Sequence, residues 1–400
     1  MAREDIASTG ACERRLRVAL VAACPFPAAR GTPVRIERMA DALVARGHRV
    51  DVVTYHLGAE CAGRAFAVHR IDNVHGYRRT APGPSWRKLL QIDPMLARKV
   101  LERSRHRGYD IIHAHHVEGL LAALPASRRL RIPLVYDVHT LLETELPYYK
   151  LGLNGAVLRR IGRIADRYLP PLAGHVVAVS ATIGESVRRH ARIDADGIDV
   201  IPNGVEKSFF DAEPAASAGT PSLTYAGNLA PYQGIQLLLR AFAHARARRP
   251  DLRLKILSDD RFDAYEKMAT ALGIRDAIDL EAVSLAELPA RLAHAHVAAN
   301  PRVDCAGLPQ KLVNYMAAGC PIVSYRGSAK HVVHGTTALI VEDNDVEGLG
   351  NAALRLIEDR SLAQRLGSAA RHYAKENLDW TCVAQRIEAV YLRLLARSQR

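Results

Sequence analysis

Cysteine is scarce and scattered in this chain of 400 residues. The six cysteines stand at positions 12, 24, 61, 305, 320 and 382, and none belongs to a C-x-x-C pair. A disulfide-stapled scaffold is therefore not expected, and the composition fits a reducing compartment. We expect each cysteine to be an ordinary core or surface residue.

Long apolar runs are also missing. No stretch of about twenty apolar residues occurs, so no membrane-spanning helix is expected. The N-terminal MAREDIASTGACERR carries charges where a signal peptide has an apolar core. We therefore expect a loose tail over residues 1–15 and a cytoplasmic protein. Zinc-finger spacing and the aromatic runs of RNA-binding domains are absent too, so nucleic acid is not an expected partner.

Positive charge, by contrast, is in excess. The 55 Lys and Arg outnumber the 42 Asp and Glu, which gives a net charge of +13 and favours anionic partners. Basic residues concentrate in RKVLERSRHR (residues 98–107) and in KLGLNGAVLRRIGRIADRYLP (residues 150–170). Two interpretations stay open: solvated helix faces, or a surface for peripheral contact with the inner face of the membrane or with an acidic acceptor.

Short β-branched runs alternate with amphipathic segments along the chain. The runs at Leu16–Ala23, Arg49–Tyr55, Tyr109–His115, Ile132–His139, His175–Ser180 and Ile198–Pro202 are predicted strands, and the alternation restarts after the Ala-, Pro-, Ser- and Gly-rich residues 211–222. This pattern predicts an α/β protein with two doubly wound, Rossmann-like domains. We assign residues 16–205 to the first domain, 206–222 to a linker, 223–378 to the second domain and 379–400 to a long C-terminal helix.

Ligands of open α/β sheets bind beyond the carboxyl ends of the strands. After the first strand, Gly31 allows close approach of the backbone, and Thr32 and Pro33 suit the N-cap and first position of a helix. The N–H groups of such a helix end can bind phosphate. A G-x-G-x-x-G motif is absent, so the dinucleotide fingerprint is missing. Capping alone explains Thr32 and Pro33, but not Gly31.

His139 ends the predicted strand of YDVHTLLETE, a position that favours a role in a site. His113 and His115 share a strand face in HAHH, but no third ligand has convincing spacing, so metal is not expected there. In the second domain, YAGNLAPYQG places Gly227, Asn228 and Gln233 in a turn after a strand. The predicted helix in GLPQKLVNYMAAG carries a lysine and an amide beside apolar positions, which is more than packing needs.

The order of these segments resembles the family-four retaining glycosyltransferases of the GT-B fold, from about Leu16 to the last helix. The segments are RGTPVRIERMADALVARGH, YDIIHAH, YDVHT, VVAVS, VIPNGV, YAGNLAPYQGIQLLLRAF and GLPQKLVNYMAAGCPIV. The resemblance implies two domains facing each other across a cleft, with the C-terminal helix returning to the first domain. It also implies transfer of a sugar from a nucleotide-diphosphate donor to an acceptor hydroxyl, in glycan, polysaccharide or glycoconjugate biosynthesis.

By motif position, the resemblance makes His139 the catalytic residue near the transferred sugar. The acceptor is expected mainly on the first domain, and the donor mainly on the second. The donor-binding residues implied are Gly31, Thr32, Gly227, Asn228, Gln233, Gly307, Leu308, Lys311, Leu312 and Asn314.

The chain departs from the family pattern at several of these positions. Asn228 and Gln233 stand where the family has an Arg and a Lys for the diphosphate, and Ala306 and Asn314 stand where it has two glutamates. Because amides bring no charge, another cation is needed, and Lys311, one helical turn before Asn314, is the best candidate. Further candidates are Arg302 and Lys330 as cations and Asp304 as a replacement carboxylate.

Asp343-Asn344-Asp345 spells the D-x-D of metal-dependent glycosyltransferases, but helix capping explains it better. We expect no metal and no other cofactor, with Lys311 and helix N-termini accepting the charge of the leaving group. Two other functions stay open. One is a sugar-nucleotide epimerase or phosphorylase on the same fold, and the other is a non-catalytic nucleotide-sugar-binding protein.

Overall fold

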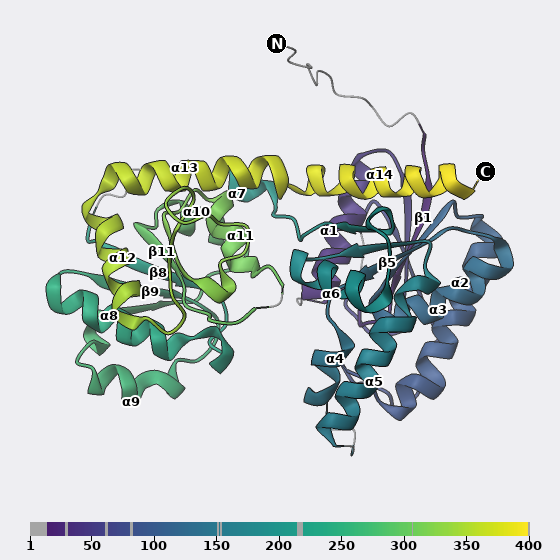
Figure 1. Cartoon of the computed structure of the whole chain (residues 1–400), viewed down its shortest axis with the longest axis horizontal. Coiled ribbons are helices and arrows are strands. Elements are labelled where there is room, and N and C mark those ends of the chain that lie inside the picture. Colours follow the sequence, from purple (N-terminus) through teal and green to yellow (C-terminus); the bar gives the residue numbers. More distant parts are fainter. Residues whose placement is uncertain are drawn as a thin grey trace, which may run out of the picture. The chain divides into compact units, whose positions relative to one another are not determined.

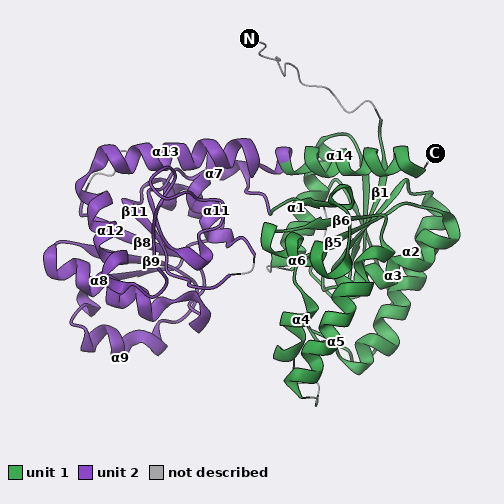
Figure 2. Ribbon diagram, viewed as in Figure 1, with its two compact units in different colours: residues 1–202, 383–400 green, residues 203–382 purple. Residues whose placement is uncertain are grey.

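The computed structural model describes residues 14–28, 31–60, 63–80, 83–149, 152, 154–213, 219–305 and 307–398 (Figure 1). The chain divides into two compact units (Figure 2). Unit 1 comprises residues 1–202 and 383–400, and unit 2 comprises residues 203–382. In the described residues, no helix combines the length and the apolar character needed to cross a bilayer.

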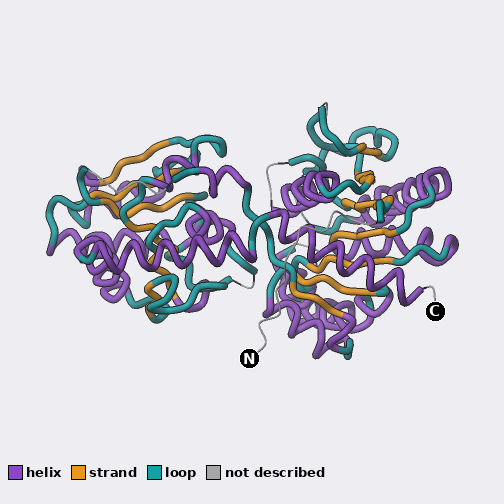
Figure 3. Tube along the Cα trace, turned by 90° about the horizontal axis from the view of Figure 1, so that it is seen from above, coloured by secondary structure: helices purple, strands orange, loops and turns teal. Residues whose placement is uncertain are grey.

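Unit 1 is built on seven parallel strands. They are β1 (Arg17–Ala22), β2 (Arg49–Thr54), β3 (Ala67–Arg70), β4 (Ile111–His115), β5 (Leu134–Val138), β6 (His175–Ala178) and β7 (Ile198–Val200). Their order in the sheet is β3-β2-β1-β4-β5-β6-β7, so the direction of winding changes between β1 and β4. The central strands are buried along their whole length because helices cover both faces (Figure 3).

The helices of unit 1 follow from the amphipathic segments between the strands. They are α1 (Gly31–Ala45), α2 (Asp93–Arg107), α3 (His116–Leu130), α4 (Leu142–Glu145), α5 (Gly155–Tyr168), α6 (Ala181–Ala191) and the part of α14 (Trp380–Ser398) from residue 383. Tyr391 of α14 is fully buried, and its hydroxyl lies 2.7 Å from His113 Nδ1. The C-terminal helix is thus part of the unit 1 core.

Unit 2 repeats the architecture with six parallel strands. They are β8 (Ser222–Ala226), β9 (Arg253–Leu257), β10 (Ile278–Glu281), β11 (Val297–Asn300), β12 (Ile322–Tyr325) and β13 (Leu339–Val341). The order is β10-β9-β8-β11-β12-β13. The predicted class, with two doubly wound Rossmann-like domains, is confirmed.

The helices of unit 2 are α7 (Lys207–Asp211), α8 (Ile235–Arg248), α9 (Asp263–Ala271), α10 (Leu288–Ala293), α11 (Gln310–Ala317), α12 (Val346–Glu358) and α13 (Arg360–Asn377). The segment predicted as a linker, 206–222, is more ordered than its composition indicated. It contains α7 and the first residue of β8, because Phe209 is buried in the core of unit 2. Residues 214–218 of that segment lie outside the described residues.

Candidate active site

Lys311 lies on α11, beside the carboxyl end of β8. Its Nζ donates to the Tyr225 hydroxyl at 2.8 Å and to Gln233 Oε1 at 2.6 Å. The same atom stands 4.2 Å from the centroid of the Tyr225 ring. All of these partners are neutral, and Lys311 forms no ion pair with a carboxylate in the described part of the chain. The ammonium is therefore held in place without having its charge balanced.

The surroundings of Lys311 disfavour its charged form. Burial, with a smaller contribution from the positive charge of Arg302, lowers the pKa of Lys311 to about 7. An anion beside Nζ would act in the opposite direction, because an opposite charge stabilises the ammonium and raises its pKa. The position is therefore suited to an anionic ligand.

The turn after β8 brings the other predicted residues to this place. Gln233 Nε2 donates to Asn228 Oδ1 at 3.2 Å, so a hydrogen-bonded chain runs from Lys311 through Gln233 to Asn228. Gly227 has a φ of +136°, and a Cβ there would stand 3.6 Å from Lys311 Cε. Glycine thus leaves the backbone bare next to the ammonium. The structure therefore places Gly227, Asn228, Gln233 and Lys311 together.

The rest of α11 holds the helix in the core. Leu312 is fully buried and Leu308 is 8 % exposed, and both belong to the hydrophobic core of unit 2. The Tyr315 hydroxyl accepts the N–H of Ala226 at 2.8 Å, which fixes α11 to the end of β8. The side chains of Leu308 and Leu312 therefore anchor α11 in the core. Gly307 precedes the helix, and a Cβ there would meet no atom within 4 Å.

Asn314 does not share the hydrogen-bond partners of Lys311. Its Oδ1 accepts a hydrogen bond from Gln310 Nε2 at 3.2 Å, and the same amide nitrogen donates to the Gly204 carbonyl at 3.2 Å. Asn314 is buried, with 7 % exposure. Gln310 and Tyr225 give no signal in the sequence, because their partners come from other segments of the folded chain.

The remaining candidates of unit 2 make no hydrogen bond to Lys311 in the described residues, although the charge of Arg302 contributes to its lowered pKa. The Arg302 guanidinium lies over the Tyr232 ring, 5.0 Å from its centroid. Asp304 is exposed, and Lys330 makes no side-chain hydrogen bond or ion pair among the described residues. Ala306 lies outside the described residues.

The D-x-D segment has local partners. Asp345 Oδ1 accepts the N–H of Gly348 at 2.8 Å and caps α12, as predicted from the sequence. Asp343 Oδ1 accepts the N–H of Gly327 at 2.8 Å. Both carboxylates therefore have structural roles.

In unit 1, His139 stands among other histidines at the carboxyl ends of β4 and β5. Its Nε2 is 3.2 Å from His115 Nδ1, and its ring stacks on that of His116 with centroids 4.5 Å apart. His116 Nε2 lies 2.8 Å from Thr32 Oγ1, and His139 Nδ1 lies 3.5 Å from the same oxygen. His116 has a φ of +61°, which is uncommon for a residue other than glycine. Such backbone strain often accompanies functional positions.

The predicted N-cap at Thr32 is wrong. Helix α1 begins at Gly31, so Thr32 lies in the first turn, and its hydroxyl is directed to the histidines instead of the helix N–H groups. The sequence could not distinguish the two positions because Thr and Pro suit both. A Cβ at Gly31 would meet no atom within 4 Å, so no contact within the described protein explains the glycine.

A buried ion pair underlies the histidines. Arg35 Nε donates to Asp137 Oδ2 at 3.0 Å, and both side chains are almost fully buried. Burial alone would raise the pKa of Asp137, but Arg35 and His139 hold it well below its usual range. Burial lowers the pKa of His139 well below its usual range, against the opposing effect of Asp137. His139 is therefore neutral at neutral pH.

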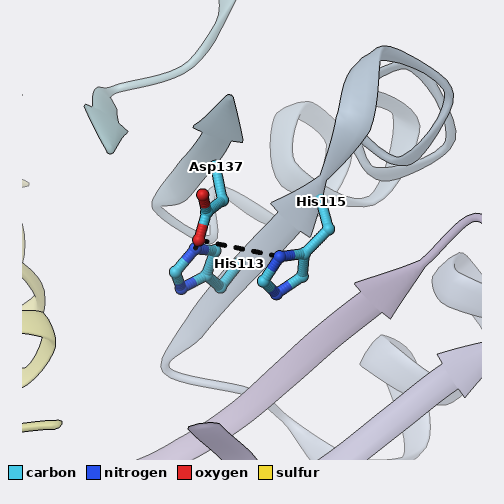
Figure 4. A group of neighbouring side chains, drawn as sticks. All are labelled: His113, His115 and Asp137. Atoms are coloured by element: carbon cyan, nitrogen blue, oxygen red, sulfur yellow. Dashed lines mark ion pairs between the residues drawn. The ribbon is translucent and has the colours of Figure 1, made fainter. Parts of the chain in front are cut away.

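His113, His115 and Asp137 together form a possible metal-binding geometry, since one ligand atom of each lies within 4.8 Å of the others (Figure 4). The third ligand, Asp137, could not be predicted from the spacing of the histidines because it comes from the neighbouring strand, β5. Asp137, however, already pairs with Arg35, and His113 Nδ1 is 2.7 Å from the Tyr391 hydroxyl. His113 Nε2, His115 Nε2 and Asp137 Oδ1 are buried without a hydrogen-bond partner among the described residues. A dication there would nevertheless face the charge of Arg35, which already pairs with Asp137 and disfavours a metal at this place.

Family models match both parts of the chain. Residues 29–209 match "Glycosyltransferase Family 4", and residues 220–359 match "Glycosyl transferases group 1". Among curated relatives, the D-inositol 3-phosphate glycosyltransferase of Pseudarthrobacter chlorophenolicus is 26 % identical over 378 residues, covering 89 % of this chain and 88 % of the relative. The GDP-mannose-dependent alpha-(1-6)-phosphatidylinositol monomannoside mannosyltransferase of Mycolicibacterium smegmatis is 26 % identical over 351 residues, which cover 77 % of this chain and 88 % of the relative.

Solved structures show the same fold. The sucrose-phosphate synthase from Thermosynechococcus elongatus has a TM-score of 0.77 at 19 % identity, over 96 % of this chain and all of the other (100 %). Anabaena Alr3699/HepE, solved with UDP and glucose, has a TM-score of 0.70 at 19 % identity, over 94 % of this chain and 99 % of that protein.

Proposed function

Because the chain belongs to the family-four glycosyltransferases of the GT-B fold, we propose that its donor is a nucleotide-diphosphate sugar. In this proposal, the sugar passes to an acceptor hydroxyl with retention of anomeric configuration and without a metal cofactor. The relatives include an inositol 3-phosphate glycosyltransferase and a phosphatidylinositol monomannoside mannosyltransferase, which favours a role in glycoconjugate biosynthesis.

The unbalanced ammonium of Lys311 is the observation that carries the proposal. A diphosphate beside Nζ would supply the negative charge that Tyr225 and Gln233 cannot, and the bare backbone at Gly227 leaves room for it. Charge-assisted hydrogen bonds of this kind are stronger than neutral ones. Lys311 would thus replace the cations that the family has at positions 228 and 233.

The reaction needs no metal in this arrangement. The bond between the anomeric carbon and the diphosphate oxygen breaks, and the acceptor oxygen forms its bond to the same carbon on the same face. The acceptor proton passes to the leaving phosphate oxygen. Lys311 would stabilise the charge that develops on the diphosphate. His139, neutral and partly buried, would orient the sugar through a hydrogen bond from its ring or main chain.

Ligand binding followed by turnover tests this proposal. UDP-, GDP-, ADP- and dTDP-sugars are screened for thermal stabilisation of the protein, and any sugar nucleotide that binds is then tested for hydrolysis and for transfer to inositol phosphates and glycans. The proposal expects at least one donor to bind and to release its sugar, with the product keeping the anomeric configuration. Inverted product would refute retention, and stabilisation by none of the donors would refute the donor class.

A non-catalytic sugar-nucleotide-binding protein is the second candidate. It is favoured by the amide at position 314, where the family has a glutamate, and by the neutral side chains at 228 and 233. Tight binding of a donor without hydrolysis or transfer to any acceptor would support this candidate. Slow hydrolysis of the donor in the absence of an acceptor would exclude it.

A further inference from the structure

Helix α5 of unit 1 carries an apolar stripe that faces solvent. Val157, Ile161, Ile164 and Tyr168 are 48, 45, 51 and 61 % exposed, respectively. Their spacing of three or four residues puts them on one side of the helix. Isolated exposed apolar residues are common, but a contiguous stripe of them marks a surface that binds something apolar.

The opposite side of α5 fixes this orientation. Leu158 and Gly162 are buried, and a Cβ at Gly162 would lie 2.4 Å from backbone atoms of Leu142 and Glu143. The Asp166 carboxylate accepts the N–H groups of Leu142 and Glu143 at 3.0 and 2.9 Å. Since α4 and α5 pack closely (Figure 1), α5 cannot turn its apolar stripe inwards.

Arginines flank the stripe. Arg159, Arg160 and Arg163 line a shallow hollow together with Ala156 and Ile164. Arg163 pairs with Glu143 at 2.5 Å, whereas Arg159, Arg160 and Arg167 form no ion pair with any carboxylate of the described chain. Asp166, the acidic residue of the helix, is buried and bonded to backbone N–H groups. The exposed face of α5 is therefore both apolar and positively charged.

We propose that this face of α5 docks on an anionic phospholipid bilayer. The helix would lie in the plane of the interface, with the apolar stripe at the boundary of the acyl chains and the guanidiniums against lipid phosphates. Charge complementarity favours this occupant, because Arg159, Arg160 and Arg167, which pair with no carboxylate of the described chain, lie beside an apolar stripe and suit an anionic interface. Tyr168, at the end of the stripe, is a residue type enriched at membrane–water interfaces.

The second basic segment of the chain lacks this combination. On α2, Lys99 pairs with Glu102 at 3.4 Å, and the guanidiniums of Arg103 and Arg107 lie 3.9 and 3.6 Å from Asp51. None of the large apolar residues exposed among the described residues belongs to α2. The structure thus assigns the membrane contact to residues 155–168 and leaves residues 98–107 as a solvated helix face.

Vesicle binding tests this assignment with the full chain. Sedimentation is measured with phosphatidylcholine vesicles and with vesicles that also contain phosphatidylglycerol, for the wild type and three double variants. Ile161→Ser with Ile164→Ser removes part of the stripe, and Arg160→Ser with Arg167→Ser removes two of its charges. Arg98→Ser with Arg105→Ser is the matched control, because it removes the same charge from exposed positions of α2.

The wild type is expected to bind only the anionic vesicles. The arginine pair is expected to weaken binding about thirtyfold, from about 1 kcal/mol per basic residue near an anionic surface. The isoleucine pair is expected to lose binding to a similar extent, and the α2 control to change it by less than about threefold. Because the changed side chains are exposed, thermal unfolding should stay at the wild-type temperature.

Other outcomes overturn the proposal. Absence of binding to anionic vesicles does so, as does an equal loss in the α2 control, which indicates a response to net charge alone. A concentration-dependent dimer that disappears in the isoleucine variant would assign the stripe to a second copy of the chain. This measurement does not depend on sugar transfer, so its result and that of the donor screen can be told apart.

Discussion

Replacing Lys311 with methionine removes the ammonium and keeps most of the side-chain volume. If this ammonium binds the donor diphosphate, the variant loses a charge-assisted hydrogen bond, which contributes about 1.5–3 kcal/mol. The dissociation constant of the nucleoside diphosphate should therefore rise roughly tenfold to a hundredfold. Lys267→Met is the matched control, because Lys267 is exposed on α9 and has no contact with Tyr225 or Gln233 in the described structure.

The pKa of Lys311 gives this prediction a second readout. In the free protein the pKa is lowered from 10.5 to about 7. Binding of a diphosphate raises it again, so binding near pH 8.5 should take up close to one proton in the wild type and none in Lys311→Met. Calorimetry in buffers with different ionisation enthalpies measures this uptake.

The same group affects folding stability in the absence of ligand. Between pH 7 and pH 10.5 the unfolded chain holds a proton on Lys311 that the folded chain has lost. The contribution of Lys311 to the free energy of unfolding therefore rises with pH across that window, by about 1.4 kcal/mol per pH unit at most. The free energy of unfolding of Lys311→Met lacks this contribution, so it should rise less between pH 7 and pH 10.5 than that of the wild type. Unchanged affinity of the variant, or the same proton uptake in variant and wild type, would refute the role of Lys311.

Three further predictions concern unit 1 and the metal. His139→Ala should abolish transfer while the donor still binds, as measured by product formation and calorimetry, and full turnover would remove His139 from the site. Arg35→Met leaves the Asp137 carboxylate buried without its cation. The free energy of unfolding, measured in denaturant titrations, should therefore fall by about 3–5 kcal/mol. A fall of less than about 1 kcal/mol would contradict the buried pair. A chelator should leave transfer unchanged, and a loss restored by added Mg²⁺ or Mn²⁺ would contradict metal independence.

The fold followed from the sequence because both of its signals are local. Residues 18–22 of β1, for example, are covered on both faces, so they form a continuous apolar run in the sequence. Helices between such strands require parallel crossovers, which leads to doubly wound sheets. The order in the predicted linker was harder to foresee, because small and polar residues dominate the composition of that segment. Its two aromatic residues, Phe209 and Phe210, pack in the core of unit 2 or against it.

The candidate site was only partly predictable, since hydrogen bonds between distant segments leave little trace in local patterns. Lys311 could be selected because a lysine on a mostly apolar helix face is unusual. Tyr225 gave no such signal, as a tyrosine is an ordinary residue in a strand. Asp137 does give a signal in the sequence, because a carboxylate inside a predicted buried strand needs a buried partner. Arg35 is that partner, 102 positions away.

The balance of charge differs between the two clusters, and this difference indicates what each can bind. In unit 1, the Asp137 carboxylate is matched by the Arg35 guanidinium, and burial keeps His115 and His139 neutral. His139 is therefore suited to act through hydrogen bonds, since its ring carries no charge at neutral pH. In unit 2, the ammonium of Lys311 faces neutral oxygens alone, and an anion removes the electrostatic cost of its burial. Within unit 2, Lys311 is therefore the position suited to an anionic group, whereas within unit 1 His139 is suited to hydrogen bonds with an uncharged group.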